Sequence, residues 1–211
     1  MTSTPPPARR SKITPEREQE FYDAVLEQLR EQGYEALTME GIAARASCGK
    51  STLYRQWRTK PQLVAAALRA DRRGTLAAVD TGTLAGDLRE AARIAAGTSG
   101  RDTRLTQALG HAVLSDEELQ AALREALVEP ELAAFDVMVG RAVARGEIAA
   151  DHPAVEFLPA QLMGVLRIRP LLEGQYADAA YLVRFVDAVI LPALGLAPAH
   201  PTPRPPGGQT P

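Results

Sequence analysis

Two short amphipathic segments, separated by only three residues, constrain the fold of this chain more than any other feature. They lie within residues 37–63, LTMEGIAARASCGKSTLYRQWRTKPQL, and the gap between them is 47–49. Apolar residues recur at helical spacing on both sides of the gap, which predicts two helices. Two such helices joined by a short turn that contains glycine form a helix-turn-helix, whose second helix fits the major groove of DNA. The apolar positions are Met39, Ile42, Ala43 and Ala46 before the gap and Leu53, Tyr54 and Trp57 after it.

The charge of the same window supports a nucleic-acid interface. Residues 41–60 contain basic side chains and no acidic ones, whereas the formal net charge of the whole chain is -2. The basic character is therefore local, which excludes a uniformly basic protein that coats nucleic acid. A length of 211 residues with 45% hydrophobic residues predicts one or two folded domains. The basic residues of the window are Arg45, Lys50, Arg55, Arg58 and Lys60.

The residue pattern over about 15–65 resembles the TetR family of one-component repressors. Beyond this stretch the chain resembles the family only in its length and its helical content. The resemblance implies an all-α fold, with an N-terminal three-helix helix-turn-helix domain and an α-helical ligand-binding and dimerisation domain. It also implies a homodimer on a palindromic operator, released by a small-molecule effector. The matching residues are Thr38, Ile42, Ala43, Ala46, Lys50, Thr52, Leu53, Tyr54, Trp57 and Lys60.

The second helix of the pair and the start of the first supply the candidate DNA contacts. Lysine can pair with guanine, glutamine with adenine, and serine or threonine with either base. The N-cap threonine and the free amides beside it suit a phosphate, and the resemblance implies phosphate contacts for Tyr54 and Lys60. The candidate DNA-binding residues are Thr38, Arg45, Lys50, Ser51, Thr52, Tyr54, Arg55, Gln56 and Lys60.

The turn departs from the family pattern at one position. Ser47 stands where the family often has glycine, so a positive φ at this position would cost about 1 kcal/mol. The usual His-Phe pair is replaced by Gln56 and Trp57. Cys48, the only cysteine, is either a small apolar turn residue or a thiol switch at a helix N-terminus.

Composition and helix signals divide the rest of the chain. We expect a disordered basic arm over 1–14, the helix-turn-helix domain over 15–60, a helical effector-binding and dimerisation domain over 61–196, and a disordered tail over 197–211. Thr14 with Pro15 predicts the start of the first helix, which glycine ends near Gln32. Pro130 either kinks or splits its helix. The later helices are expected over 61–79, 84–96, 101–114, 116–146, 153–172 and 178–194.

The last two predicted helices are apolar on more than one face, which predicts burial against a second surface. The resemblance identifies this surface as the dimer interface, and two-fold symmetry would double the base pairs read. The candidate interface residues are Leu158, Leu162, Leu166, Leu182, Phe185 and Val189. The candidate ligand-binding residues are Leu105, Leu109, His111, Phe135, Met138 and Met163, with Gln107, Arg141 and Gln161 as further polar candidates.

Several other functions receive no support from the sequence. The three histidines are far apart and no cysteine accompanies them, so neither a metal nor a cofactor is expected. No nucleophile with a nearby base is evident, so an enzyme is not expected. With a single cysteine and no long apolar run, we expect a cytoplasmic protein that does not contact membrane. The alternatives left open are a ligand-independent regulator, an activator, and an enzyme or adaptor whose helix-turn-helix domain serves only to target it to DNA.

Overall fold

The structure, a computed structural model, describes residues 13–72, 74–99 and 109–197. Most of the predicted N-terminal arm and tail therefore lies outside the described residues. All secondary structure in these ranges is helical, as expected. The chain forms two compact units, one made of Met1–Asp71 with Gln107–Leu123 and one made of Arg72–Thr106 with Arg124–Pro211. Within the described ranges, no helix combines the length and apolarity that a membrane span requires.

The first helix of the first unit, α1 (Pro15–Ala36), begins where the sequence predicts but runs to Ala36, past the predicted end near Gln32. The Thr14 side chain caps it by accepting a hydrogen bond from the Arg17 amide at 3.3 Å. Gly33 has φ 78°, which interrupts the helical backbone directly after Gln32. A left-handed residue ends the regular helix, and glycine adopts this conformation without a Cβ penalty.

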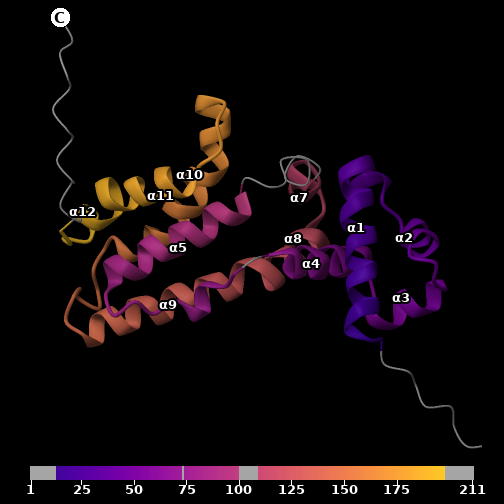
Figure 1. The fold of residues 1–211 in the computed structure, drawn as a ribbon, viewed down its shortest axis with the longest axis horizontal. Coiled ribbons are helices and arrows are strands. Elements are labelled where there is room, and N and C mark those ends of the chain that lie inside the picture. The colour runs from indigo at the N-terminus through magenta and orange to yellow at the C-terminus, as the bar shows by residue number, and fades with distance from the viewer. Residues whose placement is uncertain (1–12, 73, 100–108, 198–211) are drawn as a thin grey trace, which may run out of the picture. The chain divides into compact units, whose positions relative to one another are not determined.

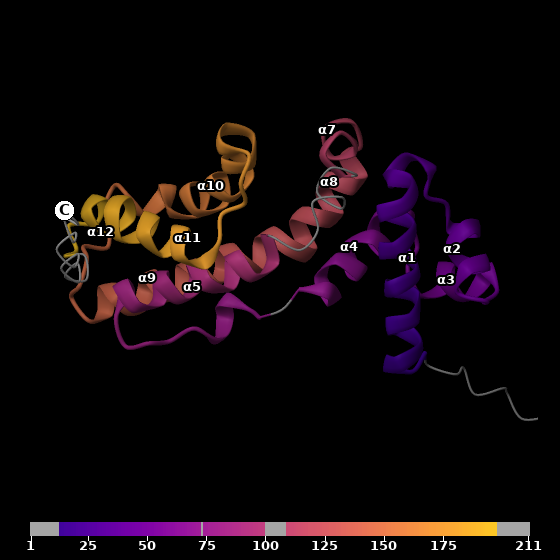
Figure 2. The ribbon, with the colours of Figure 1, turned by 45° about the horizontal axis from the view of Figure 1, so that its top comes forward.

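The predicted helix-turn-helix is present as α2 (Met39–Arg45) and α3 (Lys50–Gln56). Figures 1 and 2 show α2 and α3 on one side of α1, with α4 (Lys60–Asp71) on the other side. Trp57 is buried and meets the rings of Phe21 and Tyr22 edge-on, at centroid distances of 5.7 and 5.6 Å. This aromatic cluster ties α1 to the end of α3. The buried residues of the three-helix core include Phe21, Leu29, Tyr34, Leu37, Ile42, Leu53 and Trp57.

The first unit extends beyond the predicted boundary at residue 60. It includes α4, together with α7 (Ala112–Ser115) and α8 (Glu117–Leu123), and α8 packs on α4. The helix predicted over 61–79 is therefore too long, because α4 ends at Asp71 and Gly74 has φ 85°. A short 3₁₀ turn, η1 (Leu76–Ala78), follows. The predicted helix over 101–114 lies mainly outside the described residues.

The long helix predicted over 116–146 is divided just before Pro130. After α8 the chain forms a π-helical turn, η2 (Arg124–Val128), and then α9 (Glu129–Ala144). Proline has no amide hydrogen and cannot donate to the carbonyl four residues earlier. The wider π-helical turn lies immediately before α9, in which proline occupies one of the first two positions.

The second unit packs α5 (Leu84–Ser99) against α9, α10 (Leu158–Glu173) and α11 (Ala179–Phe185). In Figures 1 and 2, α11 runs alongside α5. The turn η3 (Val155–Phe157) precedes α10, and Gly174, at φ 67°, ends it. The helix predicted over 178–194 is α11, the π-helical turn η4 (Val186–Ile190) and α12 (Leu191–Ala193). The apolar core includes Leu84, Leu88, Phe135, Met138, Leu158, Leu162, Leu182, Val186, Ile190 and Leu191.

One charged group is completely buried in the second unit. The Asp87 carboxylate accepts hydrogen bonds from the Thr81 amide at 2.6 Å and the Thr81 hydroxyl at 2.8 Å. Its second oxygen lies 3.4 Å from Nη2 of Arg141, which also donates to the Val79 carbonyl. A buried carboxylate needs such partners because it has lost its hydration. Arg141, one of the polar candidates for ligand binding, is therefore committed to this internal network.

Candidate DNA-binding interface

Helix α3 combines a buried anchor with an exposed polar surface. Leu53 is fully buried, whereas Tyr54 is 46% exposed. Ser51, Arg55 and Gln56 are exposed as well, and Thr52 is half-buried. The helix is only seven residues long, so its apolar contacts on one side leave most of its remaining side chains accessible. The structure thus presents the residues predicted to read bases on the surface of one helix.

Helix α2 begins with the predicted cap. The Thr38 hydroxyl accepts a hydrogen bond from the Gly41 amide at 3.0 Å, and Thr38 itself is exposed. A capped N-terminus keeps the first amides of the helix in a fixed direction, and this geometry suits a phosphate oxygen. The phosphate contact at Thr38 stays a prediction.

Two of the predicted basic contacts are engaged in ion pairs. Lys50 Nζ, at the start of α3, lies 3.0 Å from the carboxylate of Glu40, near the start of α2. Arg45 forms a bidentate pair with Glu31 at 2.7 and 2.9 Å and also reaches Glu27 on α1. The hydrogen bond from Lys50 lowers the pKa of Glu40, and the hydrogen bond from Arg45 lowers the pKa of Glu31.

These pairs have different consequences for the two basic residues. All the side chains involved are at least one-third exposed, so each pair contributes little and can be exchanged. Arg45, however, lies against two glutamates of α1, Glu27 and Glu31, which would repel phosphates. Its role in DNA binding stays a prediction that requires the loss of these pairs.

Lys60 is held inside the first unit. Its Nζ donates to the Tyr34 carbonyl at 3.1 Å and lies 3.9 Å from the centre of the Tyr34 ring. The Tyr34 hydroxyl in turn donates to Asp116 Oδ2 at 2.9 Å, and Asp116 Oδ1 caps α8 through the Leu119 amide at 2.8 Å. One cluster therefore links the end of α1, the start of α4 and the start of α8. The sequence predicts Lys60 as a site residue, but it does not predict its contact with Tyr34 or the link from Tyr34 to Asp116.

The turn between α2 and α3 shows the backbone conformation that the sequence raised as a possibility. Ser47 has φ 48° and is the one non-glycine among the described residues with a positive φ. Arg17 of α1 donates to the carbonyls of Ala46 at 2.6 Å and Ser47 at 3.2 Å. No sequence signal pointed to Arg17, because its two acceptors are about 30 residues away and are backbone atoms.

Cys48 follows in the same turn and is partly buried. Burial raises the pKa of its thiol, whereas the nearby Arg17 opposes this shift only weakly. A thiol with a raised pKa has little thiolate at neutral pH and reacts slowly. The structure therefore favours the interpretation of Cys48 as a small turn residue over that of a redox switch.

The predicted ligand-binding residues do not gather in one compact unit. Leu109, which is half-buried, and His111, which is exposed, belong to the first unit. Phe135 and Met138 are buried in the apolar core of the second unit, and Met163 is half-buried on α10. Leu105 and Gln107 lie outside the described residues. Periodicity marked these positions as apolar, and a core residue and a pocket residue give the same signal.

Three of the six predicted dimer contacts are wrong because their side chains are buried in their own unit. Leu158, Leu162 and Leu182 are 2%, 3% and 0% exposed because they form the core of their own unit. Their side chains are thus unavailable to a partner subunit. Leu166 and Phe185 are half-buried, and Val189 is 44% exposed. The large exposed apolar side chains of α10 are instead Ile168, Leu171 and Leu172.

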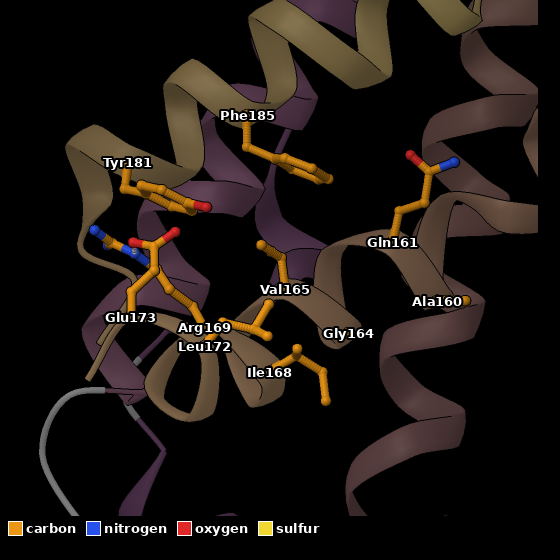
Figure 3. A pocket seen from close by; sticks show the side chains of 10 residues that line it. All are labelled: Ala160, Gln161, Gly164, Val165, Ile168, Arg169, Leu172, Glu173, Tyr181 and Phe185. Atoms are coloured by element: carbon orange, nitrogen blue, oxygen red, sulfur yellow. Dashed lines mark hydrogen bonds and ion pairs between the residues drawn. The ribbon is translucent and has the colours of Figure 1, made fainter. Parts of the chain in front are cut away.

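A pocket of about 320 Å³ lies between α10 and α11, and Figure 3 shows its lining. The Arg169 guanidinium stacks on the Tyr181 ring at 3.6 Å and pairs with Glu173 at 2.8 Å. Oε1 of Gln161 is buried and accepts no hydrogen bond from the described residues. The lining residues are Ala160, Gln161, Gly164, Val165, Ile168, Arg169, Leu172, Glu173, Tyr181 and Phe185.

Comparisons with known proteins agree with this arrangement of a helix-turn-helix and a helical domain. The family model for bacterial regulatory proteins of the tetR family matches residues 21–67, and the model for the tetracyclin repressor-like C-terminal domain matches 78–189. The DNA-binding transcriptional repressor TetR of Mycobacteroides abscessus is 35% identical over 181 residues, which are 79% of this chain and 87% of that protein.

Solved structures support the same assignment. The TetR family transcription regulator SCO0332 is 28% identical and has a TM-score of 0.64, covering 83% of this chain and 97% of its own. A TetR-family regulator from Mesorhizobium loti shares the fold with a TM-score of 0.63 at 19% identity, covering 88% of this chain and 98% of its own. The names of these proteins indicate regulators rather than enzymes. With one family model on the helix-turn-helix and another on more than half of the chain, this protein belongs to the TetR family of DNA-binding transcriptional regulators.

Proposed function

We propose that the protein represses transcription by binding a palindromic operator as a homodimer, and that a small-molecule effector releases it. The observation that carries the proposal is the exposed polar surface of α3 above a fully buried Leu53. Ser51, Thr52 and Gln56 supply the hydrogen-bonding groups that read base edges. Tyr54, Arg55 and Thr38 contact the phosphates on either side and fix the register of the helix.

Binding to DNA requires Lys50 and Lys60 to change partners. Lys50 leaves Glu40, and Lys60 leaves the Tyr34 carbonyl, when a phosphate or a base offers a stronger acceptor. The Lys50–Glu40 pair is exposed, and Lys60 gives up a hydrogen bond to a neutral carbonyl, so each exchange costs little. Glu40 then faces the DNA without a counter-charge and lowers the affinity for every sequence alike.

Exposed apolar residues of α10 and η4 support the dimer. Ile168, Leu171 and Leu172 are 48%, 82% and 75% exposed and share one face of α10 at i, i+3 and i+4 spacing, and Val189 follows on η4. Several large apolar side chains exposed together on one helix face mark an interaction surface. A second copy of the chain would cover it and the pocket of Figure 3, whose lining includes Ile168 and Leu172. Two recognition helices would then read two half-sites about 34–36 Å apart.

Chain connectivity supports control of the first unit by the second. The chain passes from the first unit to the second after Asp71 and again after Leu123. The chain therefore enters the second unit directly from the end of α4 and from the end of α8, and α4 carries Lys60 at its first position. An effector that binds one arrangement of the second unit more tightly would shift these helices and lower operator affinity. Phe135, Met138 and Met163 remain the candidates for its site, and the protein would act in the cytoplasm, where bacterial DNA lies.

Selection of bound DNA from a random pool tests the central proposal. We expect the purified full-length protein to enrich a palindrome, with an affinity that falls steeply as salt rises, because phosphate contacts release counterions. Gln56→Ala should change the preferred sequence, whereas Tyr54→Phe should weaken binding to all sequences alike. A pool without an enriched sequence would refute the assignment of α3 as a reader of bases.

Sedimentation of the free protein tests the dimer separately. We expect a dimer for the wild type and a monomer for Leu172→Glu, since a carboxylate cannot be buried unpaired in an apolar interface. Val137→Glu is the matched control, because Val137 is another exposed apolar residue, at 55%, and lies on α9 rather than α10. A wild-type monomer at micromolar concentration would contradict the homodimer. Equal operator affinity with and without an identified effector would contradict release.

A further inference from the structure

The turn that joins α2 to α3 sets the direction of the recognition helix, and it is strained. Ser47 has φ 48°, a conformation that residues other than glycine, asparagine and aspartate rarely adopt. The amides of Ser47 and Cys48 are satisfied by α2, through the carbonyls of Ala44 at 3.1 Å and Ala43 at 2.9 Å. The carbonyls of Ala46 and Ser47 are bonded from outside α2 and α3. They would lack a protein partner without a donor from another element.

Arg17 is that donor. Its Nη2 lies 2.6 Å from the Ala46 oxygen and 3.2 Å from the Ser47 oxygen. The guanidinium is itself held in place, since Nη1 pairs with Glu20 and Cζ lies 5.0 Å from the centre of the Phe21 ring. A planar guanidinium fixed on two sides can hold two neighbouring carbonyls in one orientation, which a flexible ammonium does less well.

We propose that Arg17 is a positioning residue for DNA recognition, which holds the strained Ser47 turn so that α3 presents its polar face in the geometry that reads bases. The proposal rests on the proposed use of α3 for base readout. Its physical basis is the backbone energy at position 47. A serine in the left-handed region has other backbone conformations of lower energy, whereas a glycine adopts the left-handed conformation without strain. The need for Arg17 therefore arises from Ser47.

The contacts of Arg17 distinguish this role from a direct phosphate contact. Both bonds of Nη2 go to turn carbonyls, and Nη1 is occupied by the Glu20 carboxylate. A side chain that neutralises a phosphate contributes about 0.9 to the slope of log affinity against log salt on duplex DNA. A side chain that acts through the turn contributes nothing to the slope. Salt dependence therefore separates the two roles, although both lower the affinity.

The test is a double-mutant cycle on the full-length protein, with Arg17→Met and Ser47→Gly alone and together. Methionine keeps an apolar stem against Phe21 and removes the donors. We expect Arg17→Met to weaken binding to the selected operator roughly tenfold, as the loss of charge-assisted hydrogen bonds suggests. We expect the salt slope and the affinity for random-sequence DNA to be unchanged. In the Ser47→Gly background, Arg17→Met should weaken operator binding less than threefold.

Three results would overturn the proposal. One is an equal loss in both backgrounds, because Arg17 would then not act through Ser47. Another is a fall of about one in the salt slope, which would identify a phosphate contact. The third is an unchanged operator affinity in Arg17→Met. Arg58→Met is the matched control. Arg58 is an exposed arginine just after α3 that we expect to contact a phosphate, so its replacement should lower the salt slope. If Arg17→Met does not fold, Arg17→Lys replaces it in the same cycle.

Hydrogen exchange of the free protein decides the same question without DNA. The turn amides of Ser47 and Cys48 and the Thr52 amide, which donates to the Gly49 carbonyl at 2.9 Å, report the order of the turn and the start of α3. We expect Arg17→Met to speed their exchange and Ser47→Gly to restore it, with exchange in α5 unchanged. If the wild type selects no operator, the proposed function fails, whereas this readout still supports or refutes Arg17 as the residue that holds the turn.

Discussion

The two units of the protein hold their helices together by different means. In the first unit, polar side chains connect separate elements: Arg17 of α1 binds the turn between α2 and α3, and Lys60 of α4 binds the end of α1. In the second unit, helices pack around an apolar core and leave large apolar side chains exposed on α10. Polar contacts at a surface can be exchanged for phosphate oxygens at small cost. Exposed apolar area can be covered only by another apolar surface, so the two units suit different partners.

The largest expected effect is on stability, and it tests whether α11 packs into the core of its own unit. Leu182 is 0% exposed, so Leu182→Ala should lower the free energy of unfolding by about 2–5 kcal/mol through lost contacts and a cavity. Leu171→Ala is the control, since Leu171 is 82% exposed and should change the stability of the monomer by less than about 0.5 kcal/mol. Urea denaturation at low protein concentration measures both. If the two variants lost equal stability, the division between core and surface on these helices would be wrong.

The next effect concerns the polar cluster of the first unit. Tyr34→Phe removes the hydroxyl that donates to Asp116 at 2.9 Å while keeping the ring beneath Lys60, and should cost about 1–2 kcal/mol. Tyr22→Phe is matched to it, because the Tyr22 hydroxyl also donates to a carboxylate, that of Glu18 on the same helix. We expect Tyr22→Phe to lower the free energy of unfolding by less. Its partner lies on the same helix, so the loss of this hydrogen bond removes no contact between helices.

Acid should reduce the effect of Tyr34→Phe. The pKa of Asp116 is lowered, first by the hydrogen bond from the Leu119 amide and then by that from Tyr34. A carboxyl with a lowered folded pKa stabilises the fold fully above its unfolded pKa of about 3.9, and this contribution is lost as pH falls through the folded value. The difference between the wild type and Tyr34→Phe should therefore shrink as the pH falls below about 4. A difference that grew in acid would show that Asp116 is not the acceptor that matters.

A smaller effect, of opposite sign, is expected at the turn. Ser47→Gly should raise the free energy of unfolding by up to about 1 kcal/mol, because glycine adopts φ 48° without a Cβ penalty. Thermal unfolding followed by circular dichroism measures the gain. Ser51→Gly is the control, since the same substitution inside α3 should destabilise by about 0.5–1 kcal/mol. A loss of stability in Ser47→Gly would show that the serine is not strained.

The smallest effect is expected at the exposed ion pair of the helix-turn-helix. Glu40→Gln releases Lys50 and removes one negative charge near the expected DNA surface. We expect about twofold to fivefold tighter binding to operator and random DNA alike, in line with the energy of an exposed pair. Filter binding at two salt concentrations measures it, and Glu35→Gln on another part of the same unit serves as the control. Tighter binding to the operator alone would instead assign Glu40 to base readout.

The first unit could be predicted largely from the sequence because its signals are local. Thr14, Gly33 and Thr38 act within three or four residues of their own positions, and the structure places them as expected. Arg17 and Asp116 could not be found in this way. Their partners are 29 and 82 residues distant, and the acceptors of Arg17 are backbone oxygens that leave no trace in residue type.

The second unit was predicted less well for a different reason. Periodicity shows that Leu162, Leu166 and Ile168 are apolar positions of one helix, but it does not show which of them face the core and which face solvent. That choice depends on the rotation of α10 against α5, which the π-helical turns and prolines of this unit alter. The exposed fractions of 3% for Leu162 and 48% for Ile168 are decided by this packing.

The assembly of the first unit from two distant stretches has a consequence for its synthesis. The helix-turn-helix is complete by residue 57, yet α4 is covered by α8, and Tyr34 finds Asp116 only after the intervening stretch has been made. Chains fold as they leave the ribosome, at about 5–20 residues per second. The first unit is thus the first to begin folding during translation. Its folding can be completed only several seconds later, when α8 has been synthesised and can pack on α4.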